Sequence, residues 1–142
     1  MALDGASLRY VMTDHDIVYA NLAGDMAAQA RAIIDAMTTT GLKRLIFVSS
    51  MGIYGEVPGE TYRGVLDPYR ECAALIEASD LDYTILRPGW FTRKPEGSYR
   101  ITQKGEPFQG HDIALDSLSA LIARIVTTPD LYLCCSIGVS DG

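Results

Sequence analysis

Residues 45–55 read LIFVSSMGIYG, and this stretch decides the fold of the chain. Its first four residues are apolar without a break, which is typical of a strand covered on both faces. The serines and glycines that follow end the strand and predict a loop. Ligands of open parallel sheets bind beyond the carboxyl ends of the strands, so this loop is the first candidate for a functional site.

Strands and helices alternate around this stretch. Short apolar runs predict further strands at residues 16–20, 83–86 and 131–135. Helical spacing of apolar residues predicts helices over 25–39, 67–78 and 115–127, with weaker signals for a helix at 3–12 and for strands at 99–103 and 110–113. Asp25 is placed to cap the first of the three main helices and Gly41 to end it. Asp67 is the expected N-cap of the second, with Pro68 as its first helical residue. The alternation implies an α/β fold with a parallel sheet, in one domain over residues 1–142.

Composition limits the class of protein. Hydrophobic residues make up 48% of the 142 residues and charged residues 21%, as in an ordinary globular domain. The net charge is −6 and the basic residues are scattered, which argues against binding to nucleic acid. We see neither a membrane-spanning run nor a secretory signal, and we expect a cytoplasmic protein without membrane contact.

Neither a disulfide framework nor a metal site is predicted. The three cysteines, Cys72, Cys134 and Cys135, form no CxxC pair, and His15 and His111 lie far apart. Within a strand at 131–135, Cys134 and Cys135 would point to opposite faces and pack structurally.

Three stretches together resemble a known family. Residues 16–24 resemble the fourth strand and following turn of short-chain dehydrogenases/reductases, and 45–55 resemble their fifth strand with its serine-bearing loop. Residues 79–89, SDLDYTILRPG, are similar to a stretch of the extended and atypical members, in particular the small NAD(P)-binding, NmrA-like group. The resemblance implies a Rossmann fold, NAD or NADP as cofactor, and ancestral oxidoreductase or isomerase chemistry.

The resemblance also implies site residues. Ser50 matches the family's substrate-orienting serine and is the expected catalytic residue. The expected cofactor-binding residues follow the three strands: Asn21, Gly24, Ser49, Arg87, Pro88 and Gly89. Each also has a structural interpretation: the serines could satisfy backbone groups, Gly24 could form a turn, and Arg87 could pair with a carboxylate.

Two family features are missing. No G-x-x-G-x-x-G turn is present, so we expect a partial Rossmann sheet that lacks the first strands of the full fold. The catalytic Y-x-x-x-K pair is also absent, because its tyrosine position falls on Val65 and its lysine position on Tyr69. Without a nearby lysine, a phenol with a pKa of ~10 is a poor proton shuttle, whether it belongs to Tyr54, Tyr62 or Tyr69. We therefore expect weak or lost dinucleotide binding and catalysis.

The alternative is a non-catalytic binding or assembly module. In the intact family fold the strand at 16–21 has a neighbour on both sides, and here one neighbour is missing. This strand carries no lysine or proline that would blunt an open edge. We expect a homo-oligomer, most simply a dimer, through this edge or through adjacent apolar helix faces; the other option is that residues 2–12 cover the edge as a lid.

Overall fold

The computed structural model describes residues 4–142, and its elements alternate as expected. The helices are α1 (Gly5–Met12), α2 (Met26–Thr40), α3 (Asp67–Glu77) and α4 (Leu115–Thr127), with a 3-10 turn, η1 (Gly64–Leu66), before α3. The strands are β1 (Ile17–Ala20), β2 (Arg44–Val48), β3 (Asp82–Pro88), β4 (Trp90–Thr92), β5 (Tyr99–Gln103), β6 (Asp112–Ala114) and β7 (Cys135–Asp141).

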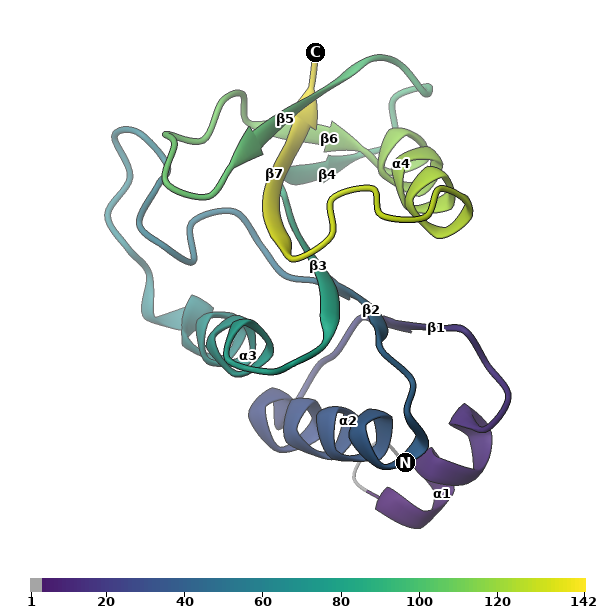
Figure 1. Cartoon of the computed structure of the whole chain (residues 1–142). Helices are drawn as coiled ribbons and strands as arrows, with labels where there is room; N and C mark the ends of the chain where they lie inside the picture. Colours follow the sequence, from purple (N-terminus) through teal and green to yellow (C-terminus); the bar gives the residue numbers. More distant parts are fainter. Residues whose placement is uncertain (1–3) are drawn as a thin grey trace.

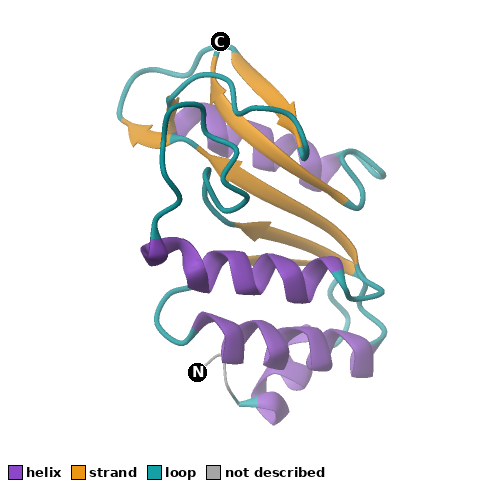
Figure 2. Cartoon of the chain, turned by 90° about the vertical axis from the view of Figure 1, so that its left-hand side faces the viewer, coloured by secondary structure: helices purple, strands orange, loops and turns teal. Residues whose placement is uncertain are grey.

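The main sheet has the strand order β1-β2-β3-β7-β5. The first four of these strands are parallel, and β5 runs antiparallel to β7 at one edge. Strands β4 and β6 form a separate, small parallel sheet. Figure 1 shows α2 and α3 on one side of the main strands and α4 on the other, and Figure 2 shows the same layers from the side. The predicted α/β class with a parallel sheet flanked by helices is confirmed.

The central strands are apolar on both faces because both faces are covered. In β2, Leu45 and Phe47 pack into the core formed with α2 and α3, while Ile46 and Val48 pack into the core formed with α4. The same alternation places Ile85 of β3 in the first core. A strand of this kind buries every side chain, which is why its sequence is a continuous apolar run.

The predicted helix boundaries agree closely with the structure. The carboxylate of Asp25 accepts a hydrogen bond from the backbone N–H of Ala28, and Gly41 adopts a left-handed conformation (φ 75°) that ends α2. The expected stripe of α2 is buried throughout: Met26, Ala30, Ile33 and Met37. In α3 the cap position is Leu66, so Asp67 is the first helical residue and not the cap. The weaker helix also exists, as α1, which Asp4 caps; Leu3 lies outside the described residues.

The predicted strand at 131–135 is wrong. Residues 131–134 form a turn in which Cys134 has φ 55°, and the strand is β7, which begins at Cys135. The sequence pattern of β7 is hard to recognise because Ile137 and Val139 face the α4 core while small or polar residues, among them Gly138, alternate with them. Cys134 is therefore exposed in a turn, and the two cysteines do not alternate within one strand.

Of the two weaker strand predictions, one is confirmed and the other is shifted along the sequence. The strand at 99–103 is confirmed as β5. The strand expected at 110–113 is shifted to β6, Asp112–Ala114, and pairs with β4, which the sequence did not predict. Strand β4 is short and two of its side chains are exposed, so it lacks the apolar pattern of a buried strand.

Gly89 joins β3 to β4 at a point with no room for a side chain. Its N–H donates to the carbonyl of Val139, and the next N–H, from Trp90, donates to the carbonyl of His111. A Cβ at position 89 would lie 2.3 Å from the carbonyl oxygen of His111. Because that oxygen is backbone, the clash can be relieved only by moving a strand.

We expect Gly89→Ala to lower the free energy of unfolding by about 1–3 kcal/mol, measured by urea denaturation. Gly97→Ala is the matched control, because a Cβ there meets nothing within 4 Å, and it should change stability by no more than about 0.5 kcal/mol. Equal denaturation midpoints for the two variants would contradict the proposed close approach.

Candidate functional site

A pocket of about 380 Å³ lies at the carboxyl ends of β2 and β3, and we call it the β2–β3 pocket. Its lining comes from the two strand ends, from β4, and from the segment that leads into α3: Ser49, Ser50, Arg63, Val65, Leu66, Tyr69, Pro88, Gly89, Trp90 and Phe91. Four of the residues predicted from sequence are thus brought together: Ser49, Ser50, Pro88 and Gly89. The position is the usual ligand site of an open parallel sheet.

Backbone hydrogen bonds hold the serine loop against the end of β3. The N–H of Ser49 donates to the carbonyl of Leu86 at 2.7 Å, and the N–H of Met51 donates to the carbonyl of Pro88 at 3.1 Å. The Ser50 hydroxyl donates to the carbonyl of Met51 at 3.0 Å. The serine side chains are therefore presented by a fixed backbone.

The Ser49 hydroxyl is buried and unpartnered. Ser49 is one of the residues that line the pocket, it is only 5% exposed, and its buried Oγ makes no hydrogen bond within residues 4–142. A buried hydroxyl without a partner costs about 1–3 kcal/mol, and native proteins rarely leave one unsatisfied. This atom is suited to bind a polar group of a ligand.

Arg87 does not reach the pocket. The sequence left two roles open, and the structure shows the second: its fully buried guanidinium forms an ion pair with Glu56, whose side chain is 7% exposed. Nε lies 3.0 Å from Oγ of Ser136, and Nη2 donates to the backbone carbonyls of Thr102 and Ser136. The guanidinium carbon also lies 5.1 Å from the ring centroid of Tyr54. Its hydrogen bonds go to groups inside the protein, and Arg87 is not among the residues that line the pocket.

The Arg87–Glu56 pair anchors the long loop that follows the serines. The carbonyl of Glu56 accepts from the N–H of Phe108, and its carboxylate accepts from the N–H of Tyr54 at 3.1 Å. From this anchor the loop runs on to Arg63 and η1, which form one wall of the pocket. The ion pair therefore positions that wall without touching the site.

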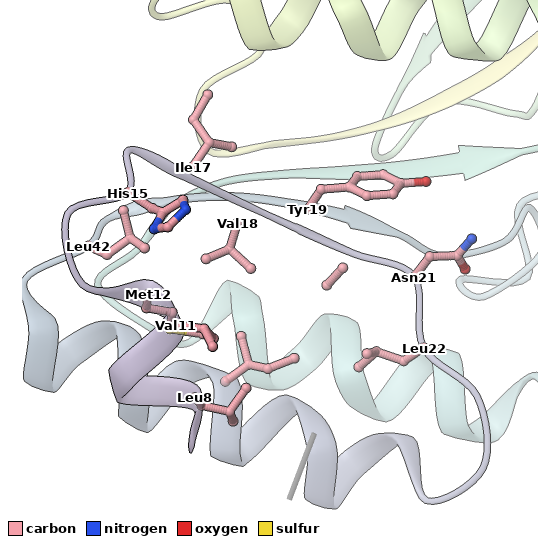
Figure 3. A pocket seen from close by; sticks show the side chains of 12 residues that line it. Leu8, Val11, Met12, His15, Ile17, Val18, Tyr19, Asn21, Leu22 and Leu42 are labelled. Carbon is pink, nitrogen blue, oxygen red and sulfur yellow. The ribbon is translucent and has the colours of Figure 1, made fainter. Parts of the chain in front are cut away.

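Asn21 and Gly24 lie elsewhere. Asn21 lines a groove of about 350 Å³ between α1 and β1, shown in Figure 3 with Leu8 and Met12 on the helix side. Gly24 has φ 79° in the turn that enters α2, where its carbonyl accepts from the N–H of Met26. Of the predicted cofactor residues, Ser49, Pro88 and Gly89 therefore line the β2–β3 pocket, whereas Arg87 lies in the core, Asn21 lines the other groove and Gly24 forms the turn before α2.

Comparison with known proteins identifies the family. A family model described as NAD(P)H-binding matches residues 1–129. The chain belongs to this family. A Rossmann-fold NAD(P)-binding family protein from Shigella flexneri is 41% identical, with a TM-score of 0.85 over 100% of this chain and 70% of that one. Comparison with curated protein sequences gives no match.

More distant solved structures share the fold. A short-chain dehydrogenase/reductase from Veillonella parvula in complex with NADP superposes with a TM-score of 0.86 at 23% identity, over 99% of this chain and 69% of that one. ChuY from Escherichia coli O157:H7, described as an anaerobilin reductase, gives 0.82 at 19% identity, over 99% and 72%. The family resemblance stated from the sequence is confirmed.

The two positions that the family's catalytic tyrosine and lysine would occupy line the pocket, but other residue types stand there. Val65 in η1 and Tyr69 in α3 are four residues apart, and both line the pocket. These are the positions that the resemblance assigns to the family's tyrosine and lysine. Valine cannot transfer a proton, and no lysine is among the lining residues.

Two other tyrosines are unsuitable as replacements. Burial raises the pKa of Tyr54, whose hydroxyl lies 2.9 Å from a carboxylate oxygen of Glu77. A hydrogen bond to Asp67 raises the pKa of Tyr62. Both phenols therefore stay protonated near neutral pH, and neither lines the pocket.

The sequence did not single out Arg63 as a site residue. It lies in a Gly/Pro-containing loop far along the chain from both strand ends, and only the folded loop brings it to the pocket. Its guanidinium carbon is 5.4 Å from the ring centroid of Trp90. A basic residue beside an exposed tryptophan is a recognisable signal only once this proximity is known.

Neither a metal-ligand cluster nor a membrane-spanning helix is found among the described residues. Across residues 4–142, no three His, Cys, Asp or Glu side chains gather to hold a metal ion. His111 contacts Asp112 at 2.6 Å on the surface, and His15 contacts the carbonyl of Thr13. None of the helices described is both long enough and apolar enough to cross a membrane.

We expect Glu56→Ala to lower the free energy of unfolding by about 3–5 kcal/mol, because it leaves the buried Arg87 charge unpaired. Glu60→Ala is the control: this glutamate lies in the same loop but is exposed, and its loss should change stability by no more than about 0.5 kcal/mol. Urea denaturation measures both variants, and equal effects would show that the ion pair does not anchor the loop.

Proposed function

We propose that this chain binds a small ligand in the β2–β3 pocket, binds NAD or NADP weakly, and does not perform classical dehydrogenase chemistry. The observation that carries the proposal is the occupation of the catalytic-pair positions by Val65 and Tyr69 in an otherwise well-formed pocket. Ser50 is the family catalytic position that remains. Its hydroxyl can orient a carbonyl or hydroxyl of a ligand, but no neighbouring acid–base pair of the family type supports proton transfer.

The residues present fit the pyrophosphate of a dinucleotide poorly. A pyrophosphate binds best at a helix N-terminus that offers free N–H groups after a glycine-rich turn. Each of the α-helices within residues 4–142 instead has a carboxylate at its start: Asp4, Asp25, Asp67 and Asp116. These carboxylates already compensate the helix dipoles and would repel a phosphate.

The nicotinamide end of a cofactor fits better than its phosphates. Ser49, Pro88 and Gly89 line the pocket and can contact a flat ring, whereas Asn21, which follows the neighbouring strand β1, lines the other groove. A bound cofactor would supply or accept a hydride; this chain would contribute contacts to the ring and a hydroxyl from Ser50. Support for the cofactor class comes from the family match and from the NADP bound to the Veillonella parvula protein.

We expect millimolar NADH or NADPH to raise the melting temperature by only a degree or two, measured by differential scanning fluorimetry. A ligand at 100 times its dissociation constant adds about 2.7 kcal/mol, which is roughly 8 °C for a domain of this size, so tight binding would be visible. A shift of that size at micromolar cofactor would overturn the weak-binding proposal.

A second candidate function is assembly, and the free edge of β1 favours it. Within residues 4–142, β1 is hydrogen-bonded only to β2. Helix α1 packs against α2 and does not add to the edge, so the groove between α1 and β1 stays open, as Figure 3 shows. Val11 and Tyr19, which line it, are 57% and 50% exposed. An apolar, unpaired edge of this kind favours strand addition.

We also propose that the partner at this edge is a second copy of the chain, in antiparallel pairing. Asp14 and Asp16 precede β1, whereas Asn21 and Leu22 follow it. Antiparallel pairing sets the acidic start of each copy beside the uncharged end of the other, so like charges stay apart. Helix α2 needs no such partner, because its apolar stripe is buried within the chain.

We expect a homodimer of about twice 15.5 kDa in sedimentation velocity at low micromolar concentration. Tyr19→Lys should dissociate it, because a charge on the half-exposed edge side chain disfavours pairing. Tyr10→Lys, on an exposed α1 side chain outside the groove lining, should leave the dimer intact. A single species near 15.5 kDa for the unmodified chain would defeat the assembly proposal.

A further inference from the structure

We propose that the ligand of the β2–β3 pocket is a flat aromatic carboxylate, held by Arg63 on its charged end and by Trp90 on its rings. This inference rests on the proposed ligand-binding function of the pocket and names the chemical class of its ligand. It comes from three independent features: the exposed aromatic walls, the sign of the charge, and the unpartnered Ser49 hydroxyl.

The walls of the pocket are unusually apolar for exposed surface. Trp90 is 49% exposed, Phe91 55% and Val65 69%, and all three line the same pocket with the buried Leu66 beneath. Large apolar side chains grouped in this way mark a binding surface. The exposed Trp90 ring beside Arg63 favours a ligand with a planar ring system, because rings stack on rings.

The charge of the pocket is opposite to that of the protein. The chain carries a net charge of −6, yet Arg63 is the one charged residue in the lining and no carboxylate is among the lining residues. Arg63 forms no ion pair with another side chain in residues 4–142. A guanidinium beside an aromatic ring can stack on it while its N–H groups bind a carboxylate in a bidentate manner. An anionic ligand therefore gains an ion pair with Arg63, whereas the lining holds no carboxylate that would pair with a cationic one.

The backbone holds Arg63 in place. Its carbonyl accepts from the N–H of Leu66 in the first turn of η1, and its guanidinium lies 5.4 Å from the Trp90 ring centroid. Ser49 sits at the strand end on the same lining, where its free hydroxyl can donate to a polar atom of the ligand. Charge, ring stacking and one hydrogen bond thus converge in a volume of about 380 Å³, which suits a ligand of two fused rings.

The test compares 2-naphthoate with 2-naphthamide, a neutral ligand of the same shape, and with 2-naphthylmethylamine, its cationic counterpart. Isothermal titration calorimetry gives the affinities. Trp90 is the only tryptophan in the sequence, so its single indole N–H signal in an ¹H–¹⁵N NMR spectrum reports binding at this pocket. We expect naphthoate to bind at least about tenfold more tightly than naphthamide and to shift the indole signal, and the amine to bind most weakly.

Three variants assign the contacts. Arg63→Gln should weaken naphthoate binding by about tenfold or more and leave naphthamide unchanged. Arg100→Gln is the matched control: it removes the same charge at an exposed site on β5, outside the lining, and should leave both affinities unchanged. Ser49→Ala should weaken both ligands several-fold, and Ser50→Ala reports whether the neighbouring hydroxyl shares this role.

The possible outcomes separate this inference from the function on which it rests. Equal affinity for naphthoate and naphthamide, or an unchanged ratio in Arg63→Gln, would overturn the carboxylate specificity. The absence of any indole shift with all three ligands would overturn it too, even if NADPH binds as weakly as proposed. Tight NADPH binding together with Arg63-dependent naphthoate selectivity would refute the weak-cofactor proposal and leave this inference standing.

Discussion

The buried ion pair between Arg87 and Glu56 is the interaction on which the site depends. A charge with no exposed surface is tolerated when it is paired and hydrogen-bonded, and here Ser136 and the carbonyl of Thr102 accept further hydrogen bonds from the guanidinium. Glu56 must therefore lie against β3, which fixes the start of the long loop after β2. That loop continues to Arg63 and η1, so an interaction in the core determines where one wall of the pocket stands.

In this fold the shape of the ligand pocket does not depend on the side chains that would transfer protons in it. The carboxyl ends of β2 and β3 form a ligand site because parallel strands end together and their loops diverge, and this geometry does not require any particular side chain. Proton transfer does require particular side chains, and Val65 and Tyr69 occupy the positions where the family resemblance places a tyrosine and a lysine. The site therefore has Rossmann geometry, and our proposal of ligand binding without acid–base catalysis rests on the residues that line it.

The elements that the sequence predicted well are those with a clear pattern of apolar residues. Strands β2 and β3 are covered on both faces, and their continuous apolar runs identified them; α4, with its clear stripe over Leu115–Thr127, was located to the residue. The sequence did not predict the correct position of strand β7, because one of its faces carries small residues and half of the usual apolar pattern is absent. Gly138 on that face packs against the ring of Phe108. The sequence did not predict strand β4, because this strand is short and exposed. Its pairing with β6 also depends on the absence of a Cβ at Gly89.

The sequence by itself determined the alternation of strands and helices, the family, the serine loop and the absence of the catalytic pair, because all of these are local patterns of residue type. Only the tertiary structure decided which residues share a site. In the folded chain Arg87 lies in the core, because the carboxylate that pairs with it, Glu56, lies on a loop that folds back over β3. Arg63 contacts Trp90 although the two residues belong to distant segments of the chain. Such contacts arise from the path of loops between strands, and the periodicity of a sequence carries no record of that path.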